Sequence, residues 1–464
     1  MSLRWLIPEL AEQAELPPPP IWQYGALYLL IELVGAGLVV LAWPKGQATM
    51  TPAFWIAIVG LPALLWGAAS GAVYWRYEED RNQRAWWNLL GRVRSFRWRN
   101  WAHARVAIVS SVVLTPEKGL AERMLGLEGS APTNPDKTLS LDQFGTSHGR
   151  NRLEEVFAGL LTPLRNDIDK LARTNDVEVV LHVGSADCSR DLVRVWKRLE
   201  FRGTPAVKWL AADMEWPLAE RWFSEPMPSC RIVLACQLRG EGESEFSEVA
   251  VGLVLANPSA LEARRSGVKP QAVIFRPIVA EADDIAQSLT TLLRAEQAAA
   301  SKIRHVWVSD LEKICARRTD AAVREAKLDV SSHDVDRALG KPGSANPWLL
   351  QAAAAEAAQY GQGAQLVATG FRNGVALNIV AHGTEPSDAP PQGTNDVVSI
   401  GWLIAMTSLF VFILVGARVF MPSDKDGPLI TVLLALCPLF VALQVAITLY
   451  LRRSTARRFW QQFS

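Results

Sequence analysis

Cysteine and histidine are scarce in this chain and scattered along it. Its 464 residues include five cysteines, an odd number without CxxC spacing, and six histidines without an HxH or HxxxH pair. Disulfide frameworks and zinc sites normally place such residues at short, regular spacings. We therefore expect no metal site, and we interpret the cysteines as free, mostly buried thiols.

The chain also lacks an excess of charge of either sign and lacks the glycine-rich motifs of nucleotide-binding proteins. It has 48 Lys and Arg against 47 Asp and Glu, which excludes a chain that binds nucleic acid over its whole surface. No Walker or GxGxxG motif occurs between an apparent strand and a helix. We expect no cofactor and no nucleic-acid partner.

Long apolar runs, in contrast, are present at both ends of the sequence. They cover residues 21–43, 53–75, 397–417 and 428–451. Each is long enough for a helix that crosses a bilayer, which needs about 20 apolar residues. The sequence therefore predicts two transmembrane α-hairpins, over 21–75 and 397–451.

The distribution of arginine predicts how these hairpins are oriented in the membrane. Residues 76–105 contain eight Arg against three acidic residues, and 452–458 contain four Arg, whereas the loops inside the hairpins carry few basic residues. The positive-inside rule then predicts that both termini (1–20 and 452–464) and the segment between the hairpins are cytoplasmic. Because residues 76–103 alternate Arg with Trp, we expect a basic amphipathic helix at the anionic headgroup surface.

One acidic residue, Glu32, lies inside an expected span. An intramembrane carboxylate can mark a transport pathway. The alternative is a protonated group, or one paired with Gln444 in the last span. With one acid and four helices, we favour the alternative.

The middle of the chain predicts an α/β fold with an internal duplication. Short apolar strands alternate with helical segments over 104–268 and again over 269–385, and a linker over 386–396 leads to the second hairpin. Each half follows the order βαβαβαββ and ends in two adjacent strands, 230–240 with 248–257 and 364–371 with 374–383. The polar segment 115–149 predicts a mobile contact surface.

This plan resembles the thiolases and β-ketoacyl synthases, whose duplicated halves build five αβαβα layers. The local likeness is carried by LGKPGSANPWLLQAAAAEAAQYGQGAQLVATGFRNGVALNIV at 339–380 and by SCRIVLACQLRGEGESEFSEVAVGLVLANPSAL at 229–261. The resemblance implies a nucleophilic cysteine where this chain has Leu210–Met214, and a histidine where it has Gly340–Gly343. Neither residue is present. The likeness thus implies the fold and a degenerate, non-catalytic relative.

One motif could still supply a nucleophile. Gly145–Gly149 matches the G-x-S-x-G pattern, with Ser147 as the nucleophile and Asp187 or Asp213 and His382 as partners. That motif requires a buried strand before the serine, but the preceding residues are polar and rich in turn formers. We favour a loop with a helix N-cap near Ser147 or Asn151.

Two functions remain in competition. The first is a non-catalytic adaptor or scaffold in a bacterial inner membrane, because the plan resembles type VI secretion lipase-adaptor proteins. Its partner would be a cytoplasmic protein, such as a secreted effector or spike protein, and the α/β domain could form a homodimer. The alternative is an enzyme or binder of acyl or lipid substrates at the membrane surface. Transport or immunity through the spans fits least well.

Overall fold

A computed structural model describes most of the chain. The residues outside it are 1–3, 7, 9–10, 47, 145–150, 172–176, 212–220, 226–227, 229, 240–244, 259–260, 262–267, 384–388, 394–397, 421–426 and 463–464. The chain divides into two compact units. One, the helical unit, comprises 8–97 and 389–464; the other, the α/β domain, comprises 2–7 and 98–388.

The long helices match the expected spans in position. They are α1 (Ile21–Ala42), α2 (Pro52–Trp55) with a π-helical turn (Ile56–Gly60), α3 (Leu61–Ala102), α13 (Ile400–Phe420) and α14 (Gly427–Gln461). In the part of the chain that the structure describes, four helical segments are long and apolar enough to cross a membrane: Ile21–Ala42, Pro52–Ala102, Ile400–Phe420 and Ala435–Gln461. The sequence therefore located these helices correctly.

Glycine lets α3 and α13 approach each other closely. A Cβ atom on Gly71 would lie 2.5 Å from the Ala405 nitrogen, and one on Gly401 would lie 2.3 Å from the Trp75 nitrogen. Small residues at such crossings allow backbone-to-backbone packing of apolar helices. Beside the crossing, the buried carboxylate of Glu78 accepts hydrogen bonds from the Ser399 hydroxyl and from the Gly401 N–H, 2.9 Å away. It therefore caps the first turn of α13.

Two sequence expectations about the helical unit are corrected. Residues 76–102 are helical, as expected, but they continue α3 rather than forming a helix of their own, because no proline or glycine turn interrupts the helix after the apolar run. Glu32 and Gln444 are not paired: among the described residues, neither polar side-chain atom of the fully buried Gln444 has a hydrogen-bond partner.

Within its described residues, the α/β domain is built on a mixed sheet of eleven strands. The first half contains β1 (Arg105–Leu114), β2 (Val177–His182), β3 (Ala206–Leu210), β4 (Cys230–Gln237) and β5 (Val249–Ala256). The second contains β6 (Ala272–Phe275), β7 (Ile278–Glu281), β8 (Ile303–Ser309), β9 (Ser331–Asp334), β10 (Ala364–Phe371) and β11 (Gly374–Ala381). The helices are α4 (Leu120–Met124), α5 (Arg152–Leu171), α6 (Cys188–Arg198), α9 (Ile285–Arg294), α10 (Lys313–Glu325), α11 (Val335–Leu339) and α12 (Asn346–Gln359).

The two halves of the sheet repeat one strand order. The first half has the order β3-β2-β4-β5-β1 and the second has β9-β8-β10-β11-β6, so both repeat one pattern, and β1 and β6 join them in antiparallel fashion. The expected closing hairpins are present as β4–β5 and β10–β11. The two halves therefore share one connectivity.

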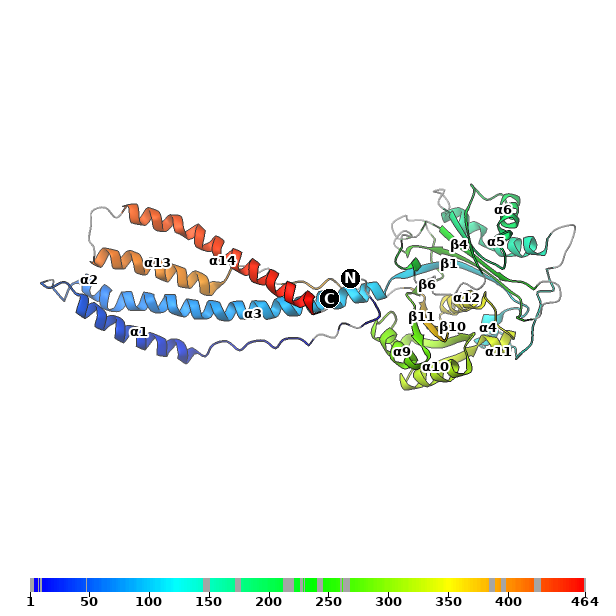
Figure 1. Ribbon diagram of the computed structural model, residues 1–464, viewed down its shortest axis with the longest axis horizontal. Helices are drawn as coiled ribbons and strands as arrows, with labels where there is room; N and C mark the ends of the chain where they lie inside the picture. Colours follow the sequence, from blue (N-terminus) through cyan, green and yellow to red (C-terminus); the bar gives the residue numbers. More distant parts are fainter. Residues whose placement is uncertain are drawn as a thin grey trace. The chain divides into compact units, whose positions relative to one another are not determined.

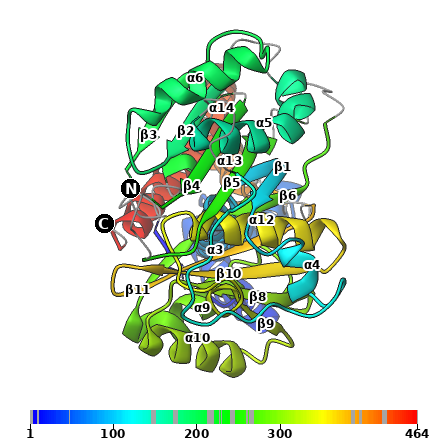
Figure 2. The same cartoon turned by 90° about the vertical axis from the view of Figure 1, so that its right-hand side faces the viewer.

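Helix α12 lies between the two half-sheets (Figures 1 and 2). Eleven of its fourteen residues are buried, because it packs against strands of both halves. Helices α5 and α6 lie over the outer face of the first half, and α9 and α10 over that of the second (Figure 2). An alanine-rich sequence suits this central place because small side chains let both sheets approach the helix.

Three details differ from the sequence expectations. Strand β9, with the polar sequence SSHD, was not predicted, since it has no apolar alternation. The apolar run over 271–280 predicts a single strand, but the structure divides it into β6 and β7 around Pro277, which cannot donate to a ladder. The sequence also predicts a helix over 216–223, and this segment lies almost entirely outside the described residues.

Candidate functional site

The residues proposed from the G-x-S-x-G pattern are only partly described. Ser147 and Asp213 lie outside the described residues, and Asp187 is an exposed residue just before α6. His382 is exposed after β11, and its Nδ1 donates a hydrogen bond to the Gln271 carbonyl, 2.9 Å away. In the neutral ring this bond leaves Nε2 as the acceptor. Of the four candidate residues, the structure therefore describes only Asp187 and His382.

The turn Gly340–Gly343, where the resemblance implies a histidine, adjoins a buried hydrogen-bond network centred on Asn346. The Asn346 side-chain oxygen accepts from Gln237 Nε2 (3.0 Å) and from the Gly343 N–H (3.2 Å). Its nitrogen donates to Ser309 Oγ, 2.8 Å away. Ser309 in turn donates to Asp336. These groups satisfy one another, as buried polar groups must.

Asp336 is the titratable member of this network. Burial raises the pKa of its carboxyl to about 6, although the Ser309 hydroxyl and the Asp310 N–H favour the charged form. The Asp310 N–H donates to the carboxylate over 2.7 Å. The carboxyl group is therefore engaged with its own chain rather than directed at a substrate.

A segment of the expected mobile loop lies over the same turn. Lys341 N–H donates to the Lys137 carbonyl (2.9 Å), and Thr138 forms a β-bridge with Gly340. Asn134 N–H donates to the Arg337 carbonyl (2.8 Å), and Glu248 N–H to the Leu139 carbonyl (2.8 Å). The expectation of a mobile contact surface over 115–149 is thus wrong for residues 134–139, because these backbone bonds hold them against the domain.

Burial disfavours the thiolate form of three cysteines in the α/β domain. Burial raises the pKa of Cys236, which is 4% exposed, well above the usual range. Burial also raises the pKa of Cys188 and of Cys315. A nucleophilic cysteine needs a lowered pKa, since the thiolate is the reactive species. The expectation of mostly buried thiols is confirmed, because Cys230, Cys236 and Cys315 are buried.

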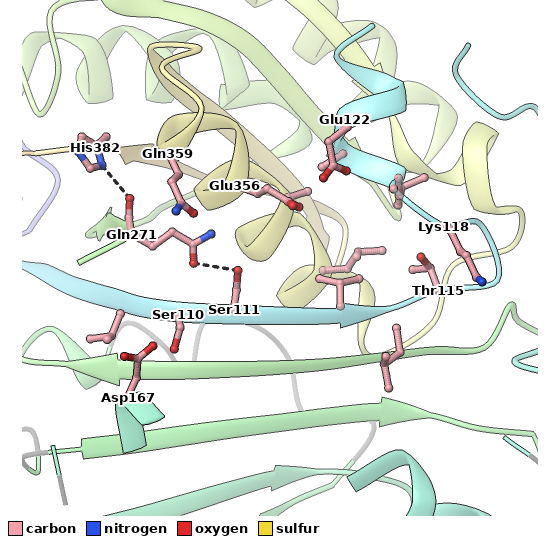
Figure 3. Close-up of a pocket in the computed structure, with 18 of the residues that line it drawn as sticks. Ser110, Ser111, Thr115, Lys118, Glu122, Asp167, Gln271, Glu356, Gln359 and His382 are labelled. Atoms are coloured by element: carbon pink, nitrogen blue, oxygen red, sulfur yellow. Dashed lines mark hydrogen bonds between the residues drawn. The ribbon is translucent and has the colours of Figure 1, made fainter. Parts of the chain in front are cut away.

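A cavity of about 770 Å³ opens between β1, α4 and α12 (Figure 3). Its polar lining includes Ser111 on β1, Lys118 and Glu122 near α4, and Gln271, Glu356 and His382. Leu349 and Ala353 of α12 contribute apolar surface. Its volume is in the range of small-molecule sites.

Two carboxylates, Glu122 and Glu356, share a proton donor at this cavity. Tyr360 Oη lies 3.2 Å from Glu122 Oε1 and 3.4 Å from Glu356 Oε1. Burial, and next the charge of Glu122, raises the pKa of Glu356 to about 7. Burial and the same two carboxylates raise the pKa of Tyr360 to about 12. Glu356 can therefore gain or lose a proton near neutral pH, a property that suits either acid–base chemistry or a structural carboxyl pair.

The Glu356 shift predicts how stability changes with pH. Since its folded-state pKa is raised, the folded chain holds a proton that the unfolded chain loses from about pH 4.5 upward. The free energy of unfolding should fall between pH 4.5 and 7 by about 1–2 kcal/mol, allowing for solvent screening. Thermal unfolding of the purified chain should show this slope, and Glu356→Gln should remove it. An unchanged slope in Glu356→Gln would contradict the assignment.

No family model matches this sequence, and no curated protein does. Solved structures similar to the chain include ketosynthases and thiolases. They include an oxazolomycin ketosynthase domain from Streptomyces albus (13% identity, 62% of this chain and 99% of that chain, TM-score 0.40). Human mitochondrial 3-ketoacyl-CoA thiolase (10%, 60% and 98%, 0.37) and 3-oxoacyl-[acyl-carrier-protein] synthase III from Aquifex aeolicus (9%, 59% and 99%, 0.37) are also among them. At these identities the likeness concerns the fold, not activity.

A histidine pair was missed by sequence analysis. His305 Nδ1 and His333 Nε2 lie 2.9 Å apart on β8 and β9, and the His333 ring lies against Trp307. Burial and His305 lower the pKa of His333 to about 4, so the pair is uncharged near neutral pH. The pair can be recognised only once the pairing of β8 with β9 is known. His182, in the middle of an apolar strand where the sequence favours a structural role, is buried and accepts a hydrogen bond from Trp348 Nε1 (3.0 Å).

Proposed function

We propose that this chain is a membrane-anchored, non-catalytic binding protein whose α/β domain holds a protein partner. The observation that carries the proposal is the hydrogen-bond network around Asn346, beside the turn Gly340–Gly343. There, polar side chains and backbone groups of the chain form hydrogen bonds with one another. A condensation reaction would need an activated thiolate and free donors for an oxyanion.

The anchoring is supported by the four long apolar helical segments. The arginines that follow the second and fourth spans favour a bacterial inner membrane with the α/β domain in the cytoplasm. The partner in this proposal is a cytoplasmic effector or spike protein of a type VI secretion system. This part rests on the resemblance of the overall plan to lipase-adaptor proteins, and a homodimer of the α/β domain is compatible with it.

The second candidate is an enzyme or binder of acyl or lipid substrates, and the 770 Å³ cavity is the observation that favours it. Its lining combines apolar side chains of α12 with the Glu122–Glu356 pair. Such a site would suit a ligand with an apolar part and a polar head that hydrogen-bonds a carboxyl group.

Cross-linking in native membranes distinguishes the two candidates. A C-terminally tagged chain, its Ser147→Ala variant and its Glu356→Ala variant would be purified after cross-linking and analysed by mass spectrometry. The adaptor proposal expects one stoichiometric protein partner with the wild-type chain and with Ser147→Ala alike. Recovery of an acyl ligand without a protein partner, lost in Glu356→Ala, would overturn it in favour of the second candidate.

A further inference from the structure

We propose that a cavity in the helical unit binds the headgroup of an anionic phospholipid. The cavity has a volume of about 320 Å³ and lies where the N-terminal segment, α3 and α14 meet. Its lining includes Gln13, Asp80, Arg84, Trp87, Thr455 and Arg458. The inference goes beyond the proposed partner binding, but it rests on the proposed membrane anchoring.

The charges of the cavity suit a phosphate group. Arg84 and Arg458 come from different helices, and Asp80 is the one carboxylate among the described lining residues. Arg84 Nη1 donates to the Ala14 carbonyl (3.1 Å), and Arg458 Nη2 donates to Ser454 Oγ (3.3 Å). Each guanidinium has five N–H donors in a planar fork, so both retain donors that can bind phosphate oxygens.

The position along the helices points to a lipid rather than to a soluble phosphate. Arg84 follows the expected span end at residue 75 by roughly 13 Å of helix, and Arg458 follows residue 451 by roughly 10 Å. The headgroup layer extends about 5–8 Å beyond each side of the hydrocarbon core, so both arginine Cα atoms lie slightly outside it. Side chains on a helix lean toward its N-terminus, which is the membrane side of both helices in this proposal, so the long arginine side chains can reach back to the headgroups. Basic pockets between transmembrane helices on the cytoplasmic side are typical sites for anionic headgroups.

The walls of the cavity are held by contacts within the helical unit. Gln13 N–H donates to Asn88 Oδ1, and Asn88 Nδ2 donates to the Gln13 carbonyl, each over 2.9 Å. These bonds tie the N-terminal segment to α3. Between α3 and α14, the rings of Trp87 and Phe459 meet edge to face, with centroids 5.1 Å apart. The site is therefore preformed by three segments, and aromatic rings of this kind favour the membrane interface.

The test is a lipid titration of the full chain. The chain would be delipidated in detergent and titrated with phosphatidylglycerol or phosphatidylethanolamine, with bound lipid counted by native mass spectrometry. Arg458→Ala should weaken phosphatidylglycerol binding about tenfold, the loss expected for a charge-assisted contact of about 1.4 kcal/mol. Arg457→Ala is the matched control, since it removes the same charge from an exposed neighbour on α14 that does not line the cavity.

Three results would overturn the inference. If Arg457→Ala and Arg458→Ala weaken phosphatidylglycerol binding equally, the arginines attract anionic lipids diffusely and not at this cavity. Equal binding of phosphatidylethanolamine would mean that the site does not select anionic headgroups. Competition by inorganic phosphate at the same concentration as lipid would assign the site to a free phosphate. Extraction of the chain from membranes by alkaline carbonate would instead refute the anchoring, so the two failures are distinguishable.

Discussion

Replacing Glu248 with alanine is expected to lower the free energy of unfolding of the α/β domain by about 3 kcal/mol. Glu248 is 1% exposed at the start of β5. It accepts two hydrogen bonds from Arg152 (2.8 and 2.6 Å), one from the Leu141 N–H (2.7 Å) and one from the Arg239 N–H (2.9 Å). Its removal leaves a partly buried guanidinium and two backbone donors without their acceptor, which costs more than the net value of the pair.

The protonation of Glu248 sets the pH range of this effect. Burial alone would raise the pKa of Glu248, but the hydrogen bonds from Arg152 and from the backbone outweigh burial and lower it. Because the folded-state pKa is lowered, the stabilisation is present at neutral pH and is lost as the pH falls through that pKa. The difference between wild type and Glu248→Ala should therefore shrink in acid.

Hydrogen exchange of the β4 and β5 amides in the detergent-solubilised chain measures the Glu248 effect locally. Glu245→Ala is the control, because Glu245 is an exposed acid beside the same strand and its loss should change stability by less than about 0.5 kcal/mol. If the β4 and β5 amides exchange at the same rate in both variants, Glu248 does not stabilise these strands as proposed.

The strands that the sequence predicts most plainly are those covered on both faces of the sheet. Every residue of β4, β5 and β11 is buried, so each strand is a continuous apolar run that composition alone reveals. Strand β9 lies at the edge of the sheet and is mostly exposed. An edge strand needs no apolar run, and its pairing with β8 depends on the tertiary structure.

The candidate site was less predictable because its members are distant in the sequence. The G-x-S-x-G pattern drew attention to Ser147, whereas the carboxyl pair combines Glu122, in a segment expected to be a loop, with Glu356 on the central helix. The raised pKa of Glu356 results from burial and from the charge of Glu122. Neither cause can be read from the local sequence, since both arise when α4 packs against α12.

Gly340→Ala should be the most disruptive single-methyl change near the Asn346 network. Gly340 has φ 90° and ψ −152°, a conformation that essentially only glycine adopts. A Cβ atom there would lie 2.1 Å from the Lys137 carbonyl oxygen. We expect a loss of about 3 kcal/mol or more, from backbone strain together with displacement of the segment that crosses the turn.

Gly361→Ala is the control variant that separates the cost of backbone strain from the cost of a steric clash. Gly361 has a positive φ of 77°, but nothing lies within 4 Å of its added Cβ, so its replacement should cost only about 1 kcal/mol. Exchange of the Leu139 and Lys341 amides should accelerate in Gly340→Ala and stay unchanged in Gly361→Ala. If both variants lose the same free energy of unfolding, the 134–139 segment contributes little to stability at the turn. The larger loss in Gly340→Ala would mean that the 134–139 segment is an integral cover of this turn.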